Sequence, residues 1–239
     1  MKRLITPFLA LLTLCGLLAA CAAPATPAPE ATGGPVATAG PVATDAPAQT
    51  EPPALAGTPD MEEVKQGAET MMPILDSIVR TMGIGGDTPY APRDAEFFWS
   101  VLYHMGENWG HTHPLVERKE DGAVIVPRQV MQEFATAAFL DYDGLLPLPQ
   151  SLAQALAYDE GLDAYRLAPS DMGATETRLE EVFTGADGVI TARVSLNVGP
   201  DELLGMLDFQ LAPNPYAAGV SEPVYHYSVC GAQNAAPQG

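Results

Sequence analysis

Four side chains that could bind a metal ion lie close together between residues 104 and 113. They are His104, Glu107, His111 and His113. Imidazole nitrogens and a carboxylate hold zinc-like ions, and an ion with an open position can activate water for hydrolysis. The spacing differs from the histidine pair of helical zinc peptidases, and Gly106 and Gly110 indicate a loop. We therefore predict a polar loop without metal ligands, and keep a metal-dependent enzyme that uses this stretch as an alternative.

Other patterns resemble catalytic or binding motifs only in part. Asp141-Tyr-Asp-Gly144 begins like a calcium loop, but Leu145 and Leu152 stand where such a loop needs oxygen ligands. Cys230 follows His226 by four residues, which on one strand separates them by about 13 Å, too far for a direct hydrogen bond. No serine stands in a Gly-x-Ser-x-Gly elbow. We predict no catalytic residue and no cofactor.

Aromatic side chains are concentrated between residues 90 and 109. They include Tyr90, Phe98, Trp99, Tyr103 and Trp109. On an exposed face such rings can form a platform for a sugar or a peptide, to which Tyr225 and Tyr227 could contribute. Core packing accounts for most of them more simply, so we interpret this region mainly as core.

The N-terminus has the build of an export signal. Lys2 and Arg3 precede a mostly apolar run over residues 5–18, which is too short and wrongly flanked for a stable transmembrane helix. The run leads into Leu18-Ala19-Ala20-Cys21, and these four residues resemble the lipobox of bacterial lipoproteins.

This resemblance has consequences for processing and location. It implies a signal peptide over residues 1–20, a diacylglyceryl group on the Cys21 thiol and cleavage just before that residue. Two or three acyl chains hold a protein stably at a membrane, whereas one does not. We therefore expect a lipid-anchored protein on the extracytoplasmic side of the cell membrane. A plain cleaved signal, with Cys21 as an incidental thiol, is the alternative.

The segment after the cysteine has the composition of a linker. Residues 22–58 are rich in alanine, proline and threonine, and none is aromatic. Such a segment cannot bury enough apolar surface to offset the entropy lost on ordering. We predict that residues 21–58, with the lipid on Cys21, form a disordered tether.

The rest of the chain is strongly acidic. After Thr58 it holds 27 acidic and 9 basic residues, and the whole chain has a formal net charge of −19. A domain this acidic repels nucleic-acid phosphates, so we predict no nucleic-acid partner. The expected partners are the membrane, through the lipid on Cys21, and a cell-wall polymer or an envelope protein. Cys230 would be the one cysteine of this part, so a disulfide framework is not expected.

Apolar periodicity predicts helices first and strands afterwards. Apolar residues three and four positions apart favour helices over residues 61–82, 93–105, 127–140 and 150–157. The first of these is expected to have Thr58 as its N-cap and to be interrupted by Pro73. Alternation of apolar and polar residues predicts strands over residues 190–198, 207–211 and 225–229. Residues 175–184 are the expected hairpin partner before them, connected through Gly185-Ala-Asp-Gly188, and shorter strands are expected at 123–126 and 162–167.

These elements predict an α+β fold, with N-terminal helices packed on one face of a C-terminal antiparallel sheet of about four to five strands. One globular domain would span residues 59–231, followed by a flexible tail over residues 232–239. The leading functional prediction is a membrane-tethered, non-enzymatic binding or regulatory module of the bacterial cell envelope. The alternatives are the envelope enzyme built on residues 104–113 and a solute-binding lipoprotein.

Overall fold

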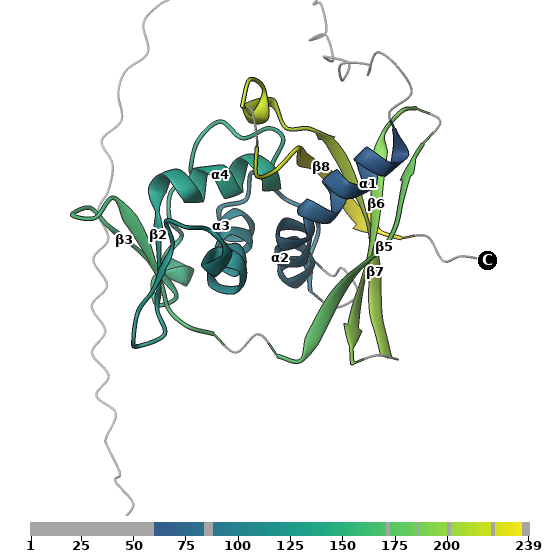
Figure 1. Ribbon diagram of the computed structural model, residues 1–239. Helices are drawn as coiled ribbons and strands as arrows, with labels where there is room; N and C mark the ends of the chain where they lie inside the picture. The colour runs from purple at the N-terminus through teal and green to yellow at the C-terminus, as the bar shows by residue number, and fades with distance from the viewer. Residues whose placement is uncertain are drawn as a thin grey trace, which may run out of the picture. The chain divides into compact units, whose positions relative to one another are not determined.

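A computed structural model describes residues 60–83, 88–170, 173–185, 187–199, 202–220 and 223–235 (Figure 1). The signal peptide, the lipobox and the tether predicted for residues 1–58 lie outside these ranges. The described residues form four α-helices and two four-stranded antiparallel sheets, so the predicted α+β class is confirmed.

The predicted helix over residues 61–82 is two helices, α1 (Met61–Thr70) and α2 (Met72–Met82). Pro73 accounts for the break, because in the first turn of a helix a proline needs no amide hydrogen bond. The N-cap of α1 is Asp60, whose carboxylate accepts a hydrogen bond of 3.0 Å from the Glu62 amide. The predicted cap, Thr58, lies outside the described residues.

The next predicted helices also form. They are α3 (Ala95–His104) and α4 (Arg128–Ala138). The loop expected at Gly106 is wrong, because α3 continues as a π-helical turn, η1 (Met105–Trp109), and a 3-10 turn, η2 (Gly110–Thr112). A Cβ atom at position 106 would lie 2.6 Å from Leu167 Cδ2. The glycine therefore does not end the helix. Its role is to let this turn pack closely against the strand that contains Leu167.

The C-terminal sheet has the order β5-β6-β7-β8. Its strands are β5 (Thr175–Thr184), β6 (Ile190–Val198), β7 (Glu202–Pro213) and β8 (Tyr227–Asn234). The predicted C-terminal antiparallel sheet of about four to five strands is thus present with four strands, and β7 is longer than expected. Strand β8 reaches Asn234, three residues past the end predicted for the domain at Gly231.

A second sheet was not predicted. It has the order β1-β2-β4-β3, with β1 (Glu117–Arg118), β2 (Val124–Pro127), β3 (Leu156–Asp159) and β4 (Ala164–Leu167). The helix expected over residues 150–157 is wrong: a 3-10 turn, η3 (Gln150–Leu152), precedes β3. Periodicity does not separate helix from strand in so short an apolar segment. The strand predicted at 162–167 pairs with β2 and β3, outside the C-terminal sheet.

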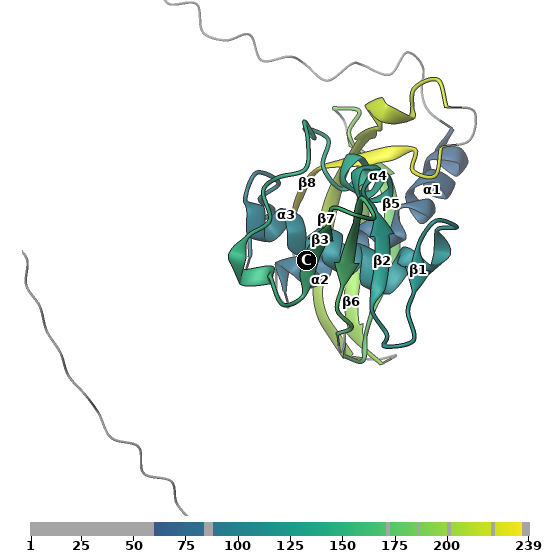
Figure 2. The same ribbon diagram turned by 90° about the vertical axis from the view of Figure 1, so that its left-hand side faces the viewer.

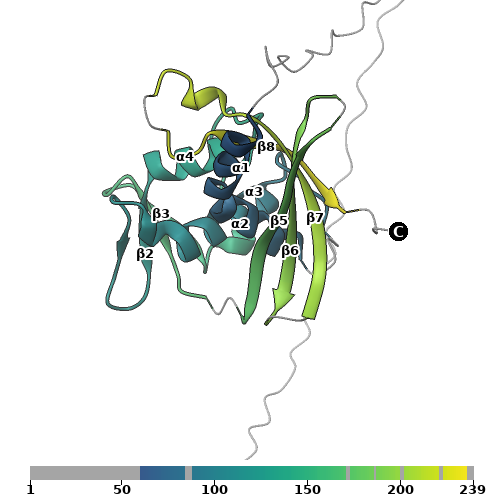
Figure 3. The ribbon, with the colours of Figure 1, turned by 45° about the vertical axis from the view of Figure 1, so that its right-hand side comes forward.

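The helices lie between the two sheets (Figures 1 and 3), so the expectation that they cover one sheet on one face is only partly met. Figure 2 looks along this stack, with β2 and β3 nearest the viewer. Helix α3 shows the consequence, because most of its residues are buried, among them Phe98, Trp99 and Leu102, and Glu96 in its first turn is exposed. A helix that is apolar on most of its surface is typical of such a buried position.

Candidate functional site

The four residues of the predicted metal-binding alternative are not brought together. His104 lies at the end of α3 and is largely buried, whereas His111 is exposed on η2. Glu107 is buried on η1, with its carboxylate 3.7 Å from the Arg118 guanidinium. His113 lies 3.5 Å from a carboxylate of α4. In the part of the chain that the structure describes, no group of three or more His, Cys, Asp or Glu side chains could hold a metal ion.

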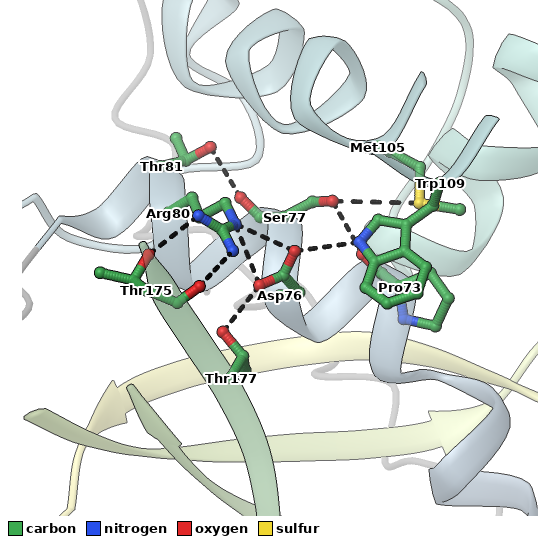
Figure 4. Close-up of polar contacts among 9 residues, drawn as sticks. All are labelled: Pro73, Asp76, Ser77, Arg80, Thr81, Met105, Trp109, Thr175 and Thr177. Carbon is green, nitrogen blue, oxygen red and sulfur yellow. Dashed lines mark hydrogen bonds and ion pairs between the residues drawn. The ribbon is translucent and has the colours of Figure 1, made fainter. Parts of the chain in front are cut away.

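Asp76 is the centre of a buried polar cluster (Figure 4). Both of its carboxylate oxygens accept from Arg80 Nε at 3.0 Å. Trp109 Nε1 donates to one oxygen at 2.9 Å, and Thr177 Oγ1 donates to the other at 2.7 Å. Asp76 therefore joins α2, the π-turn and the edge strand β5 through one charge, and its hydrogen-bonding capacity is used within the protein.

Arg80 extends this cluster along β5. Its guanidinium donates to the Thr175 hydroxyl at 3.0 Å and to the Thr175 carbonyl at 3.2 Å. A buried carboxylate is tolerated when a cation and further donors satisfy it, as they do here. The arrangement indicates that the cluster fastens the helical layer to the C-terminal sheet.

Asp76, Ser77 and His104 are the residue types of a hydrolytic triad, but their contacts exclude that role. The Ser77 hydroxyl donates to the Pro73 carbonyl at 2.7 Å and is fully buried. His104 Nδ1 is buried without a hydrogen-bond partner among the described residues. Burial and the positive charge of Arg80 lower the pKa of His104 to about 4, an effect that Asp76 partly opposes. No activated hydroxyl is present in this group.

The other residues singled out in the sequence also have structural contacts. Cys230 Sγ donates to the Gln210 carbonyl at 3.3 Å, and desolvation raises the pKa of its thiol, which disfavours the reactive thiolate. Asp143 forms an exposed ion pair of 2.8 Å with Arg93. Trp99 is buried and donates to the Leu146 carbonyl at 2.9 Å. The interpretation of the aromatic region as mainly core is therefore confirmed for Trp99 and its neighbours in α3.

A groove lies elsewhere, between α4 and the connection from β7 to β8, which the structure describes over residues 214–220 and 223–225 and which lies above α4 in Figure 1. These described residues are called the 214–225 segment below. Its volume is about 360 Å³, in the range of ligand-binding pockets. It is lined by Glu133, Thr136, Asn214, Tyr216, Ala217, Val220, Pro223, Val224 and Tyr225. We call it the groove below.

Asn214 fixes both ends of the 214–225 segment. Its carboxamide oxygen accepts from the Tyr216 amide at 3.0 Å and caps the 3-10 turn η4 (Pro215–Ala217). Its carboxamide nitrogen donates to the Tyr225 carbonyl at 3.2 Å, and its backbone amide donates to the His226 carbonyl at 2.9 Å. The Tyr216 hydroxyl donates to the Tyr142 carbonyl at 2.6 Å. The groove wall is thus held by several hydrogen bonds.

Exposed apolar side chains gather on this wall. Tyr216, Val220 and Val224 are each about half exposed, at 51%, 52% and 54%. Single exposed apolar residues are ordinary, but a group beside a concave surface is typical of an interaction site. No site was predicted here, because most of these residues lie between the strands predicted at 207–211 and 225–229. The signal available was two valines outside the alternating pattern of the strands.

Glu133 places a negative charge beside these apolar residues. It projects from α4 with its side chain 36% exposed, and His113 Nε2 lies 3.5 Å from its carboxylate. Across the groove, burial and the nearby Glu133 charge raise the pKa of the Tyr225 phenol well above its usual value. Tyr225 therefore keeps its proton at physiological pH, and Glu133 is the charged member of the lining.

Comparison with protein-family models, with curated proteins and with solved structures found no match. Within the described ranges, no helix has the length and apolar character needed to cross a membrane.

Proposed function

We propose that this protein is a membrane-tethered extracytoplasmic lipoprotein whose globular domain is a non-enzymatic binding module, with the groove as its binding site. The observation that carries the proposal is the set of exposed apolar side chains on a wall held in place by Asn214 and Tyr216. A preformed apolar concavity with few polar groups is the usual form of a binding site.

The polar groups around the groove support binding rather than catalysis. The Thr136 hydroxyl donates to the Glu133 carbonyl at 2.8 Å, and both ends of the Asn214 carboxamide are used in the 214–225 segment. Aromatic and aliphatic surface, the Tyr225 hydroxyl and one carboxylate are left for a ligand. A nucleophile paired with a base, which hydrolysis would need, is not among these residues.

The anchor is supported by the lipobox Leu18-Ala19-Ala20-Cys21, which follows the cationic start and the apolar run of an export signal. Cys21→Ser should move the protein out of the membrane fraction of the producing cells, because no acyl chain can then be attached. The matched control is Cys230→Ser, which should stay in the membrane. Mass spectrometry of the mature N-terminus should find a fatty-acylated cysteine, and an unmodified Cys21 would contradict the anchor.

Binding at the groove is tested with the full lipoprotein in nanodiscs. The probe is the end-blocked peptide Gly-Ser-Leu-Ser-Leu-Ser-Gly, measured by calorimetry. Val224→Ser should weaken binding about fivefold, because the apolar contact that it removes corresponds to roughly one buried methylene group. The control Val198→Ser makes the same change at an exposed valine of β6, outside the groove, and should leave the affinity unchanged. Equal losses in both variants, or no binding at all, would contradict the proposed site.

A further inference from the structure

The groove combines one carboxylate with an apolar wall, and this combination indicates the kind of partner that fits. We propose that it takes an extended peptide segment of an envelope protein in which a lysine or arginine lies next to an aliphatic side chain. The cation would meet Glu133, and the aliphatic side chain would lie against Val220 and Val224. This inference rests on the proposed function of the groove as a binding site.

The charge on Glu133 is not neutralised by a strong cation. Among the described residues, the basic side chain within 4.0 Å of its carboxylate is His113. His113 Nδ1 accepts from the Leu115 amide at 3.2 Å, so the ring proton lies on Nε2, which faces Glu133. This N–H can donate a hydrogen bond to the carboxylate, but no lysine or arginine of the described residues pairs with it. A ligand cation can supply the missing charge.

The partial burial of Glu133 favours a cation over a neutral ligand. A carboxylate that is 36% exposed has lost part of its hydration, so an added cation gains more than it would at a fully exposed site. The long-range field acts in the same direction, because the chain has a formal net charge of −19. Basic segments are attracted to such a surface and acidic ones are repelled.

The remaining lining residues favour an aliphatic neighbour to that cation. Tyr216, Val220 and Val224 present half-exposed apolar surface, while the carboxamide of Asn214 is already hydrogen-bonded within the segment. A sugar polymer needs free donors and acceptors along its hydroxyl groups. A peptide with alternating aliphatic and basic side chains instead matches apolar surface with apolar surface and charge with charge.

The test compares three end-blocked peptides on the full lipoprotein in nanodiscs. They are the neutral probe used above, Gly-Ser-Leu-Ser-Leu-Ser-Gly, and versions with lysine or glutamate in place of its middle serine. We expect the lysine peptide to bind about fivefold more tightly than the neutral one and the glutamate peptide more weakly, since a partly exposed ion pair contributes up to roughly 1 kcal/mol. Raising the salt concentration should remove this preference but not the binding of the neutral peptide.

Two variants connect the preference to Glu133. Glu133→Gln should abolish the preference for lysine, and Glu133→Lys should reverse it toward the glutamate peptide. Glu120→Gln, which removes the same charge from an exposed residue outside the groove, should preserve it. Circular dichroism checks that each variant is folded, and the two Glu133 variants test the inference independently of each other.

The outcomes separate the two proposals. If the neutral and lysine peptides bind equally and Val224→Ser weakens both, the groove is a binding site and the charge inference is wrong. If the lysine preference survives in both Glu133 variants, it arises from the general charge of the protein, and the inference is again wrong. If none of the three peptides binds, the proposed function fails and the inference fails with it.

Discussion

The carboxylate of Asp76 is buried and forms an ion pair with Arg80. Its side chain is 3% exposed, and Arg80, Trp109 and Thr177 supply the hydrogen bonds that solvent would otherwise supply. The gain from such a buried pair over an apolar pair is small, but removal of one partner leaves the other uncompensated. The consequence is a strong dependence of stability on this one carboxylate.

Asp76→Asn should lower the free energy of unfolding by about 3 kcal/mol, because the Arg80 guanidinium would remain in a largely buried site without its counter-charge. Urea unfolding at neutral pH measures the change. The matched control is Asp143→Asn, which removes the same charge from an exposed ion pair with Arg93 and should leave stability almost unchanged. Similar losses in both variants would show that burial does not set the effect.

His104 contributes to the pH dependence of stability, because it is buried in its neutral form. Its folded-state pKa is lowered to about 4 by burial and by Arg80, whereas in the unfolded chain the imidazole has its ordinary pKa of 6.5. The unfolded chain therefore binds a proton first as the pH falls. The stability linked to neutral His104 is fully present above pH 6.5 and is lost as the pH falls through the folded pKa.

Between pH 7.5 and pH 4.5, His104 should account for a loss of about 2 to 3 kcal/mol in the free energy of unfolding. His104→Phe, which fills the site with a side chain that does not titrate, should be less acid-sensitive than the wild type by that amount. His111→Gln, at an exposed histidine, should keep the acid sensitivity of the wild type. Parallel pH profiles for the wild type and His104→Phe would contradict the assignment.

At the scale of elements, the π-turn η1 joins the helical layer to the first sheet. Gly106 allows this contact, because a Cβ there would lie 2.6 Å from Leu167 Cδ2 and 3.2 Å from Val126 Cγ2. Both neighbours are fully buried, so neither can move without disturbing the core. The π-turn can therefore approach the sheet this closely only because Gly106 has no side chain.

Gly106→Ala should destabilise the protein by about 1 to 3 kcal/mol, since overpacking of the core outweighs the better helix propensity of alanine. Thermal or urea unfolding measures this cost. A double-mutant cycle supplies the control: in a Leu167→Ala background the added methyl group has room, and Gly106→Ala should then cost much less. An equal cost in both backgrounds would mean that the close approach to Leu167 is not its cause.

At the scale of the whole molecule, both sheets are needed to enclose the helices, and β8 closes the C-terminal sheet at one edge. Ala232, Gln233 and Asn234 pair with Phe209, Asp208 and Leu207 of β7, and the Ala235 amide donates to the Met206 carbonyl at 2.9 Å. The domain therefore includes residues that the sequence analysis assigned to a flexible tail.

A chain that stops after Gly231 should lose about 2 kcal/mol of unfolding free energy, because several ladder hydrogen bonds to β7 disappear. A chain that stops after Ala235 keeps all of β8 and serves as the control, with stability equal to that of the full chain. Equilibrium unfolding of the two truncated forms measures the difference. Equal stability in both would place the end of the domain at Gly231, the position predicted from the sequence.

The sequence by itself predicted the α+β class, the break at Pro73 and the four strands of the C-terminal sheet. These features depend on local chemistry. A proline lacks the amide hydrogen-bond donor that a helix interior needs, and alternation of apolar and polar residues over nine positions, as in β6, indicates a strand. The lipobox is also local, so the anchor is a prediction that needs no fold.

Only the tertiary structure decided where the short elements and the candidate site lie. Strand β3 is four residues long, too short for periodicity, and pairing with β4 decides its conformation. Asp76 and Thr177 are 101 residues apart in sequence, and Glu133 and Val224 come from different elements of the groove. Local spacing in the sequence does not predict such contacts, because the buried charge cluster and the groove both form by packing between segments that are far apart in the chain.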